Sequence, residues 1–74
     1  MARHFSGGRL RAARRAAGLT AEQVADAVGR SPWAVWRWER GAAQPGIGTA
    51  DLLADAVGVS LPDLLADDRQ AVTV

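Results

Sequence analysis

The 74-residue sequence contains no cysteine, no lysine and no tyrosine. Without cysteine the chain can form neither a disulfide framework nor a thiolate metal site, which fits a reducing cytoplasm. No apolar run approaches the roughly 18 residues that cross a membrane. The start, "MARHFSGGRL", lacks the apolar segment of a secretory signal. We therefore expect a cytoplasmic protein that does not enter the membrane.

The sequence also has few of the residues that catalysis uses. Its one histidine, His4, falls near the start of the chain, outside any predicted helix. Gly7 and Gly8 precede a helix but follow no strand, so they do not form a glycine-rich phosphate loop. Asp67 and Asp68 could hold a hard cation weakly, although a solvated helix end is the simpler interpretation. We expect no enzyme, no cofactor and no metal site.

Charge is unevenly distributed along the chain. Residues 1–41 carry eight arginines and three acidic residues, a balance of +5. Residues 42–74 carry one arginine and five aspartates, a balance of −4. This asymmetry predicts a polarised surface whose basic side favours a polyanion, and an ordinary solvated helix surface is the alternative.

Glycines and capping residues divide the chain into short helices. Glycine follows the helical segments at positions 18, 29, 41 and 58, where it enters the left-handed region without steric cost. Capping residues mark helix starts at Thr20, Ser31 and Ser60. No stretch alternates apolar and polar residues for long enough to predict a strand. The five predicted helices span residues 8–17, 21–28, 32–40, 48–57 and 61–66.

These helices place an all-helical domain at residues 8–66, between a flexible arm at 1–7 and a tail at 67–74. The tail is expected to be disordered, or Val72 to Val74 would dock on a partner subunit. Helices this short need tertiary packing to be stable. The predicted core consists of Leu10, Ala13, Leu19, Val24, Ala25, Val28, Val35, Trp38, Ile47, Leu53, Ala56, Val57, Val59, Leu61, Leu64 and Leu65.

The segment "SPWAVWRWERG" contains all three tryptophans. On a helix that turns about 100° per residue, Val35 and Trp38 share one face. The opposite face then presents Trp33, Trp36, Arg37 and Arg40. An aromatic residue on an apolar stripe is ordinarily a core residue, which explains Trp38. Two exposed indoles between arginines instead indicate a contact surface.

The helices at 21–28 and 32–40, joined by a tight turn with glycine, have helix-turn-helix geometry. The run "GLTAEQVADAVGRSPWAVWRWERG" resembles the core of the Cro and phage-repressor family, the lambda-repressor-like helix-turn-helix domains of xenobiotic-response-element type. The run "PGIGTADLLADAVGVSLPDLL" resembles that family's fourth and fifth helices, so the resemblance extends from Leu10 to Leu65. It implies a compact five-helix domain whose third helix enters the DNA major groove.

The resemblance also implies roles for particular residues. A structural ion pair is expected between Arg14 and Glu39. Three departures from the family pattern affect the DNA-facing surface: Ala21 opens the second helix, bulky apolar residues occupy the base-reading positions, and the loop after the third helix lacks a cation. All three remove hydrogen-bonding or charge capacity. The residues at these departures are Ala21, Pro32, Trp33, Trp36, Ala42, Ala43 and Gln44.

The sequence therefore predicts a transcription regulator of the repressor type that binds double-stranded DNA as a homodimer, in the bacterial cytoplasm and associated with the nucleoid. Arg37 and Arg40 would meet phosphates or a guanine edge, and the two indoles would pack on thymine methyls and sugars or wedge between bases. Arg3 and His4 would reach a neighbouring phosphate. The expected DNA-binding residues are Arg30, Ser31, Trp33, Trp36, Arg37, Arg40 and Gln44.

A protein-interaction module is the alternative. Tryptophan and arginine are enriched at interface hot spots, so Trp33 and Trp36 would instead bind a protein partner. The low charge of residues 42–44 favours this interpretation. An antitoxin-like protein that binds both DNA and a protein would combine the two functions.

Overall fold

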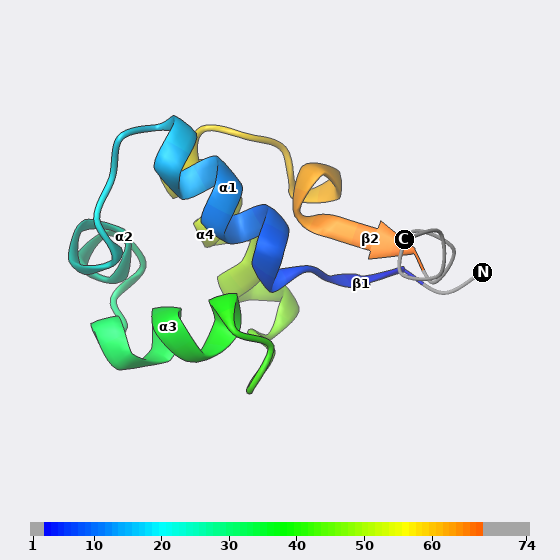
Figure 1. The fold of residues 1–74 in the computed structure, drawn as a ribbon, viewed down its shortest axis with the longest axis horizontal. Coiled ribbons are helices and arrows are strands. Elements are labelled where there is room, and N and C mark those ends of the chain that lie inside the picture. The colour runs from blue at the N-terminus through cyan, green and yellow to red at the C-terminus, as the bar shows by residue number, and fades with distance from the viewer. Residues whose placement is uncertain (1–2, 68–74) are drawn as a thin grey trace.

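The computed structural model describes residues 3–67 of the chain, so the expectation that Val72 to Val74 dock on a partner lies outside the described residues. The chain forms four α-helices, one 3₁₀ helix and a two-stranded ribbon (Figure 1). In chain order the elements are β1 (Arg3–Phe5), α1 (Gly7–Ala16), α2 (Ala21–Val28), α3 (Pro32–Glu39), α4 (Ile47–Val57), the 3₁₀ helix η1 (Leu61–Leu64) and β2 (Leu65–Asp67).

The predicted bounds of α2 and the predicted capping residues of α2 and α3 are confirmed, whereas α1 begins and ends one residue earlier than predicted and α3 ends one residue earlier. The Thr20 hydroxyl accepts from the Gln23 N–H at 3.0 Å, and the Gln23 side chain accepts from the Thr20 N–H at 2.8 Å. This reciprocal pair satisfies two donors at the start of α2. At the start of α3 the Ser31 hydroxyl accepts from the Ala34 N–H at 3.2 Å, with Pro32 at the first helical position. The caps fix α2 and α3 on either side of a short turn.

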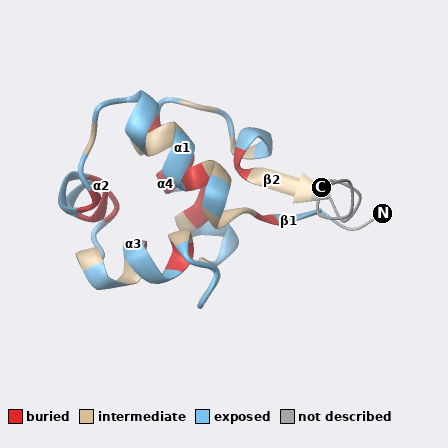
Figure 2. Cartoon of the chain, in the orientation of Figure 1, coloured by how far each residue is buried: buried red, intermediate tan, exposed pale blue. Residues whose placement is uncertain are grey.

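The core lies where the helices face one another (Figure 2). Nine of its thirteen buried residues were predicted: Leu10, Val24, Ala25, Val28, Val35, Trp38, Leu53, Val57 and Leu64. Another six predicted residues are half-buried and pack against these: Ala13, Leu19, Ala56, Val59, Leu61 and Leu65. The sequence analysis missed the buried Phe5, Ala21, Ala50 and Ala54. Three of these four are alanines, whose small side chains let helix backbones approach closely.

The prediction that Ile47 belongs to the core was wrong, because its side chain is 82% exposed. Ile47 is the first residue of α4, before the helix has made a full turn against its neighbours. The packing face of α4 begins with Ala50 and continues through Leu53, Ala54 and Val57.

The prediction that the chain contains no strand was also wrong. Residues 3–5, in the segment expected to be a flexible arm, pair antiparallel with β2, with Phe5 opposite Leu65. The ribbon buries Phe5 and places the Ser6 N–H 2.8 Å from the Leu64 carbonyl oxygen. Two strands of three residues are too short to show an alternating pattern, and they lie about sixty residues apart in sequence.

The fifth α-helix, predicted at 61–66, is instead the 3₁₀ helix η1 followed by β2. The helical turn ends at Leu65, whose φ of −106° and ψ of 143° are extended. This extended backbone allows Leu65 to pair with Phe5. Residues 65 and 66, which were predicted to end a helix, therefore belong to the strand β2. Of the helices in residues 3–67, none has the length and apolar character needed to cross a bilayer.

Gly7 allows α1 and α3 to approach each other closely. A Cβ atom at this position would collide with the backbone carbonyl oxygens of Trp38 and Glu39. The neighbouring Gly8 has no such contact, since the nearest atom to its Cβ position is the Ser6 hydroxyl oxygen at 3.9 Å. The start of α1 is therefore held directly against the end of α3.

Candidate nucleic-acid interface

The two faces of α3 differ as the sequence predicted. Val35 and Trp38 are 0% and 7% exposed and belong to the core. Trp33 and Trp36 are 59% and 43% exposed, although they are large apolar side chains. A helix with a period of 3.6 residues separates these pairs onto opposite sides. The indoles at 33 and 36 consequently face solvent in this structure.

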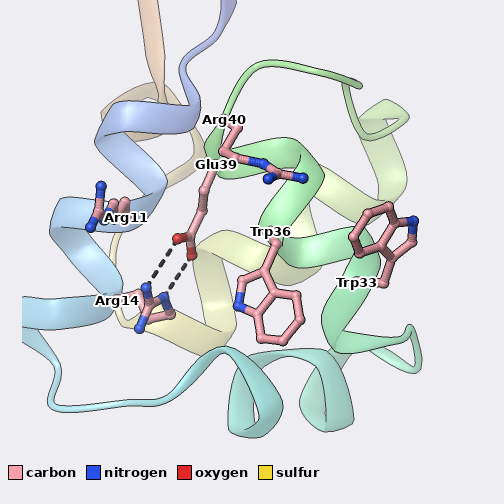
Figure 3. Close-up of a pocket in the computed structure, with 6 residues that line it drawn as sticks. All are labelled: Arg11, Arg14, Trp33, Trp36, Glu39 and Arg40. Atoms are coloured by element: carbon pink, nitrogen blue, oxygen red, sulfur yellow. Dashed lines mark hydrogen bonds and ion pairs between the residues drawn. The ribbon is translucent and has the colours of Figure 1, made fainter.

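A guanidinium group lies against one of the exposed indoles. The Arg40 Cζ atom lies 5.7 Å from the centroid of the Trp33 ring, two helical turns earlier on the same face (Figure 3). A cation at this distance from an indole is attracted by the electrons of the ring face. The contact orders both side chains while leaving the Arg40 donors available to an anion.

The ion pair expected between Arg14 and Glu39 is present and joins α1 to the end of α3. Arg14 Nε donates to Glu39 Oε2 at 2.6 Å, and Arg14 Nη2 donates to Oε1 at 3.0 Å. The Arg14 and Glu39 side chains are only 14% and 6% exposed. A third donor, Arg14 Nη1, meets the Leu19 carbonyl oxygen at 3.0 Å. The hydrogen bond with Glu39 raises the pKa of Arg14, since it stabilises the charged form.

A shallow hollow of about 320 Å³ lies between α1 and α3. Figure 3 shows its lining: Arg11, Arg14, Trp33, Trp36, Glu39 and Arg40. The Glu39 carboxylate is already paired with Arg14, so the hollow is electropositive. Arg11 was not among the predicted site residues. It precedes Arg14 by one helical turn, and that spacing was the signal that could have placed it on the same face of α1.

The other predicted site residues do not line this hollow. Arg37 is exposed on α3, and Arg30 is exposed in the turn before that helix. The hydroxyl of Ser31 caps α3 through the Ala34 N–H. Gln44 is exposed but lines a different hollow, beside β1 and the start of α4. The structure therefore brings Trp33, Trp36 and Arg40 together and leaves Gln44 apart from them.

The position where the family resemblance expects a polar residue at the start of α2 is occupied by Ala21, which is 4% exposed. The neighbouring polar side chain, Gln23, hydrogen-bonds to the Thr20 backbone. Pro32, at the start of α3, is half-buried. The outer surface of α3 thus carries arginines and indoles, whereas the exposed charged residues of α2 are Glu22 and Asp26. The hydroxyl groups of Thr20 and Ser31 are engaged in capping.

Comparison with known proteins places this geometry in a family. The helix-turn-helix domain family matches residues 7–67. A search of curated proteins found no match. The P22 c2 repressor protein, in complex with a synthetic operator, has a similar structure with a TM-score of 0.77 and 31% identity. That similarity covers 84% of this chain and 94% of the repressor chain.

Two bacterial regulators are also similar in structure. The restriction-modification controller protein C.AhdI from Aeromonas hydrophila has a TM-score of 0.75 and 33% identity, over 78% of this chain and 88% of that protein. The clp gene regulator ClgR from C. glutamicum has a TM-score of 0.74 and 29% identity, over 78% of this chain and 75% of that protein. Because the family matches residues 7–67 and these regulators share the capped helix pair and its fold, the chain belongs to the lambda-repressor-like helix-turn-helix domain family.

Proposed function

We propose that this protein is a DNA-binding transcription regulator whose helix α3 enters the major groove of double-stranded DNA. The observation that carries the proposal is the outer face of α3, where exposed indoles at 33 and 36 lie beside Arg40. The P22 c2 repressor protein, which shares the fold, is found in complex with an operator, and this supports the same docking mode here.

Cations around α3 supply the contacts to the DNA backbone. Arg37 and Arg40 project from the exposed side of the helix, and Arg30 precedes it in the turn. Arg11 adds a fourth guanidinium from α1, across the hollow. At the start of α3, Pro32 has no N–H and the Ser31 cap binds the Ala34 N–H, so the Trp33 N–H is the donor there that can meet a phosphate oxygen. These contacts position the domain on a duplex without reading its sequence.

The indoles supply the contacts to the bases. An indole has one N–H donor and no acceptor, so it matches few of the hydrogen-bonding patterns of base edges. Its apolar surface suits the C5 methyl group of thymine and the sugars, or a wedge at a flexible base step. Trp33 and Trp36 therefore make the protein sensitive to methyl groups and DNA shape more than to polar base edges.

Two copies of the protein bind one operator. The helix α3 has eight residues and reaches only a few base pairs. Two copies on half-sites about 34 Å apart, one turn of DNA, would double the sequence that is read. We therefore propose a homodimer on a two-fold symmetric site.

Selection from random-sequence duplex DNA, followed by salt titration, tests the proposal. Each phosphate contact lowers the slope of log affinity against log salt by about 0.9. We expect a selected sequence and a slope that corresponds to several phosphate contacts. Failure to bind at low salt, or an affinity independent of salt, would exclude the proposed function.

A protein-interaction module is the second candidate, supported by the same exposed indoles and by the uncharged, exposed Ala42 after α3. Tryptophan at an interface centre commonly contributes most of the binding energy. If the indole surface mediates self-association, Trp36→Asp should dissociate the assembly in light scattering. If the variant assembles as the native protein does, the indole surface does not mediate self-association.

A further inference from the structure

The hollow between α1 and α3 also has the dimensions of a small-molecule site. Its volume of about 320 Å³ is at the lower end of the range for pockets that hold small organic ligands. The Arg14–Glu39 pair, whose side chains are nearly buried, forms its floor. Figure 3 shows Arg11 on the α1 side of this pair and the Trp36 ring on the α3 side. A molecule in the hollow would therefore lie between a cation and an aromatic ring.

The charge of the hollow favours an anion. The lining holds three arginines and one glutamate, a balance of +2. Arg14 uses its donors on Glu39 and on a backbone carbonyl oxygen. Within residues 3–67 the Arg11 side chain makes no hydrogen bond or ion pair, and that of Arg40 makes only its contact with Trp33. Because the planar fork of a free guanidinium matches a carboxylate with two parallel hydrogen bonds, the anion that fits best is a carboxylate.

The exposed indoles favour a planar ring in the same ligand. Trp33 and Trp36 are half exposed or nearly so, and both line the hollow. Aromatic rings attract one another in offset-stacked and edge-to-face arrangements, which a saturated ring cannot reproduce. A flat ring placed against an indole also removes apolar surface of both from water.

We propose that the α1–α3 hollow binds a small planar aromatic carboxylate, with the carboxylate on the Arg11 guanidinium and the ring against the Trp36 indole. The ligand covers side chains that the proposed function assigns to DNA, so ligand and duplex exclude each other and the ligand releases the protein from its operator. This regulatory step rests on the proposed function, whereas binding of the carboxylate to the free protein does not.

Nuclear magnetic resonance of the full chain tests the site with 2-naphthoate as the probe. The three tryptophans give three indole N–H signals, which Trp33→Phe and Trp36→Phe assign. We expect a dissociation constant of about 1 mM or below, since the ligand is small and the hollow is open. The Trp36 signal should shift to saturation while that of the buried Trp38 stays in place. No saturable shift up to about 10 mM, or an equal shift of Trp38, would overturn the proposal.

Two matched compounds separate the ring from the charge. Decahydro-2-naphthoate keeps the carboxylate without the planar ring, and 2-naphthamide keeps the ring without the charge. Each should bind at least about tenfold more weakly than 2-naphthoate. Equal affinity for the saturated acid would reject the ring contact, and equal affinity for the amide would reject the contact with the guanidinium.

Arg11→Ala tests the residue assigned to the carboxylate, with Arg15→Ala as its matched control. Both arginines are exposed on α1, but only Arg11 lines the hollow. We expect Arg11→Ala to weaken 2-naphthoate binding about tenfold and Arg15→Ala to weaken it less than about twofold. An unshifted Trp38 signal in the free variant shows that the core is intact. Equal affinities of the two variants would reject the assignment.

Competition with the selected duplex tests the regulatory step. When 2-naphthoate is present at ten times its dissociation constant, exclusive binding lowers the apparent affinity for the duplex about elevenfold. Decahydro-2-naphthoate at the same concentration matches the ionic strength and should have little effect. A duplex affinity that 2-naphthoate leaves unchanged would reject the regulation. Binding of the acid by a protein that binds no duplex would reject the proposed function and retain the site, and duplex binding without acid binding would do the reverse.

Discussion

The Arg14 guanidinium and the Glu39 carboxylate form a two-pronged ion pair, with Nε 2.6 Å from Oε2, that fixes α1 against the last residue of α3. Glu39 adjoins Arg40, which lies against Trp33. A pair that looks purely structural therefore holds in place the helix that presents the indoles. A substitution that breaks this pair should lower the stability of the domain, and it should weaken binding by displacing α3.

Replacing Arg14 by alanine leaves the Glu39 carboxylate unpaired at 6% exposure. We expect a loss of about 3–5 kcal/mol in the free energy of unfolding, measured by urea denaturation. Arg15→Ala is the control, since Arg15 is exposed on the same helix and should change stability by less than about 0.5 kcal/mol. Equal stability of the two variants would show that the pair contributes little. Because folding raises the pKa of Arg14, the stability from its charged form should be fully present at neutral pH and should be lost on the alkaline side as the pH rises through that raised pKa.

Replacing Gly7 by alanine should destabilise the domain by about 1–3 kcal/mol, since the added methyl group collides with backbone oxygens of α3. Gly8→Ala should instead be neutral or stabilising by up to about 1 kcal/mol, because alanine is the better helix former and the space is open. Thermal unfolding of the two variants measures the difference. A Gly7→Ala protein as stable as Gly8→Ala would mean that α1 and α3 are not held in this close contact.

Removing an indole should alter sequence preference. Trp33→Ala or Trp36→Ala should lower affinity for the selected duplex more than for random duplex, whereas Arg40→Ala should lower both. A chemical counterpart uses the native protein on the selected duplex with each thymine replaced by uracil, which removes only the C5 methyl group. We expect about 0.8 kcal/mol of lost binding for each methyl group that is contacted. Full affinity for every uracil-containing duplex would argue against methyl contacts.

Arg11 should contribute a phosphate contact from α1. Arg11→Ala is expected to weaken binding to all duplexes alike and to reduce the salt slope by about 1. Arg15→Ala is again the control, because Arg15 lies on α1 without lining the hollow. If the two variants bind DNA with the same salt dependence, Arg11 makes no contact with the backbone.

The sequence predicted those features that depend on neighbouring residues. The caps at Thr20 and Ser31 and the outward direction of Trp33 follow from local hydrogen bonding and the helical period. The Arg14–Glu39 pair could be predicted only from the family resemblance, because no local pattern links residues that lie 25 positions apart.

Features that depend on distant contacts could not be predicted in this way. The pairing of Phe5 with Leu65 converts an expected helix end into a strand, and it exists only once the rest of the chain has folded. The exposure of Ile47 depends on which turn of α4 first meets the core. The spacing of Arg11 from Arg14 places both on one face of α1, but the contact of that face with α3 is a long-range one that the helical period does not show.

The antiparallel pairing of Arg3 with Asp67 has an architectural consequence. It brings the entry and exit of the described domain to one point, so polypeptide attached at either side would emerge there, at the opposite end of the molecule from α2 (Figure 1). The domain could therefore be inserted into a surface loop of another protein through two adjacent linkers, with α3 left uncovered.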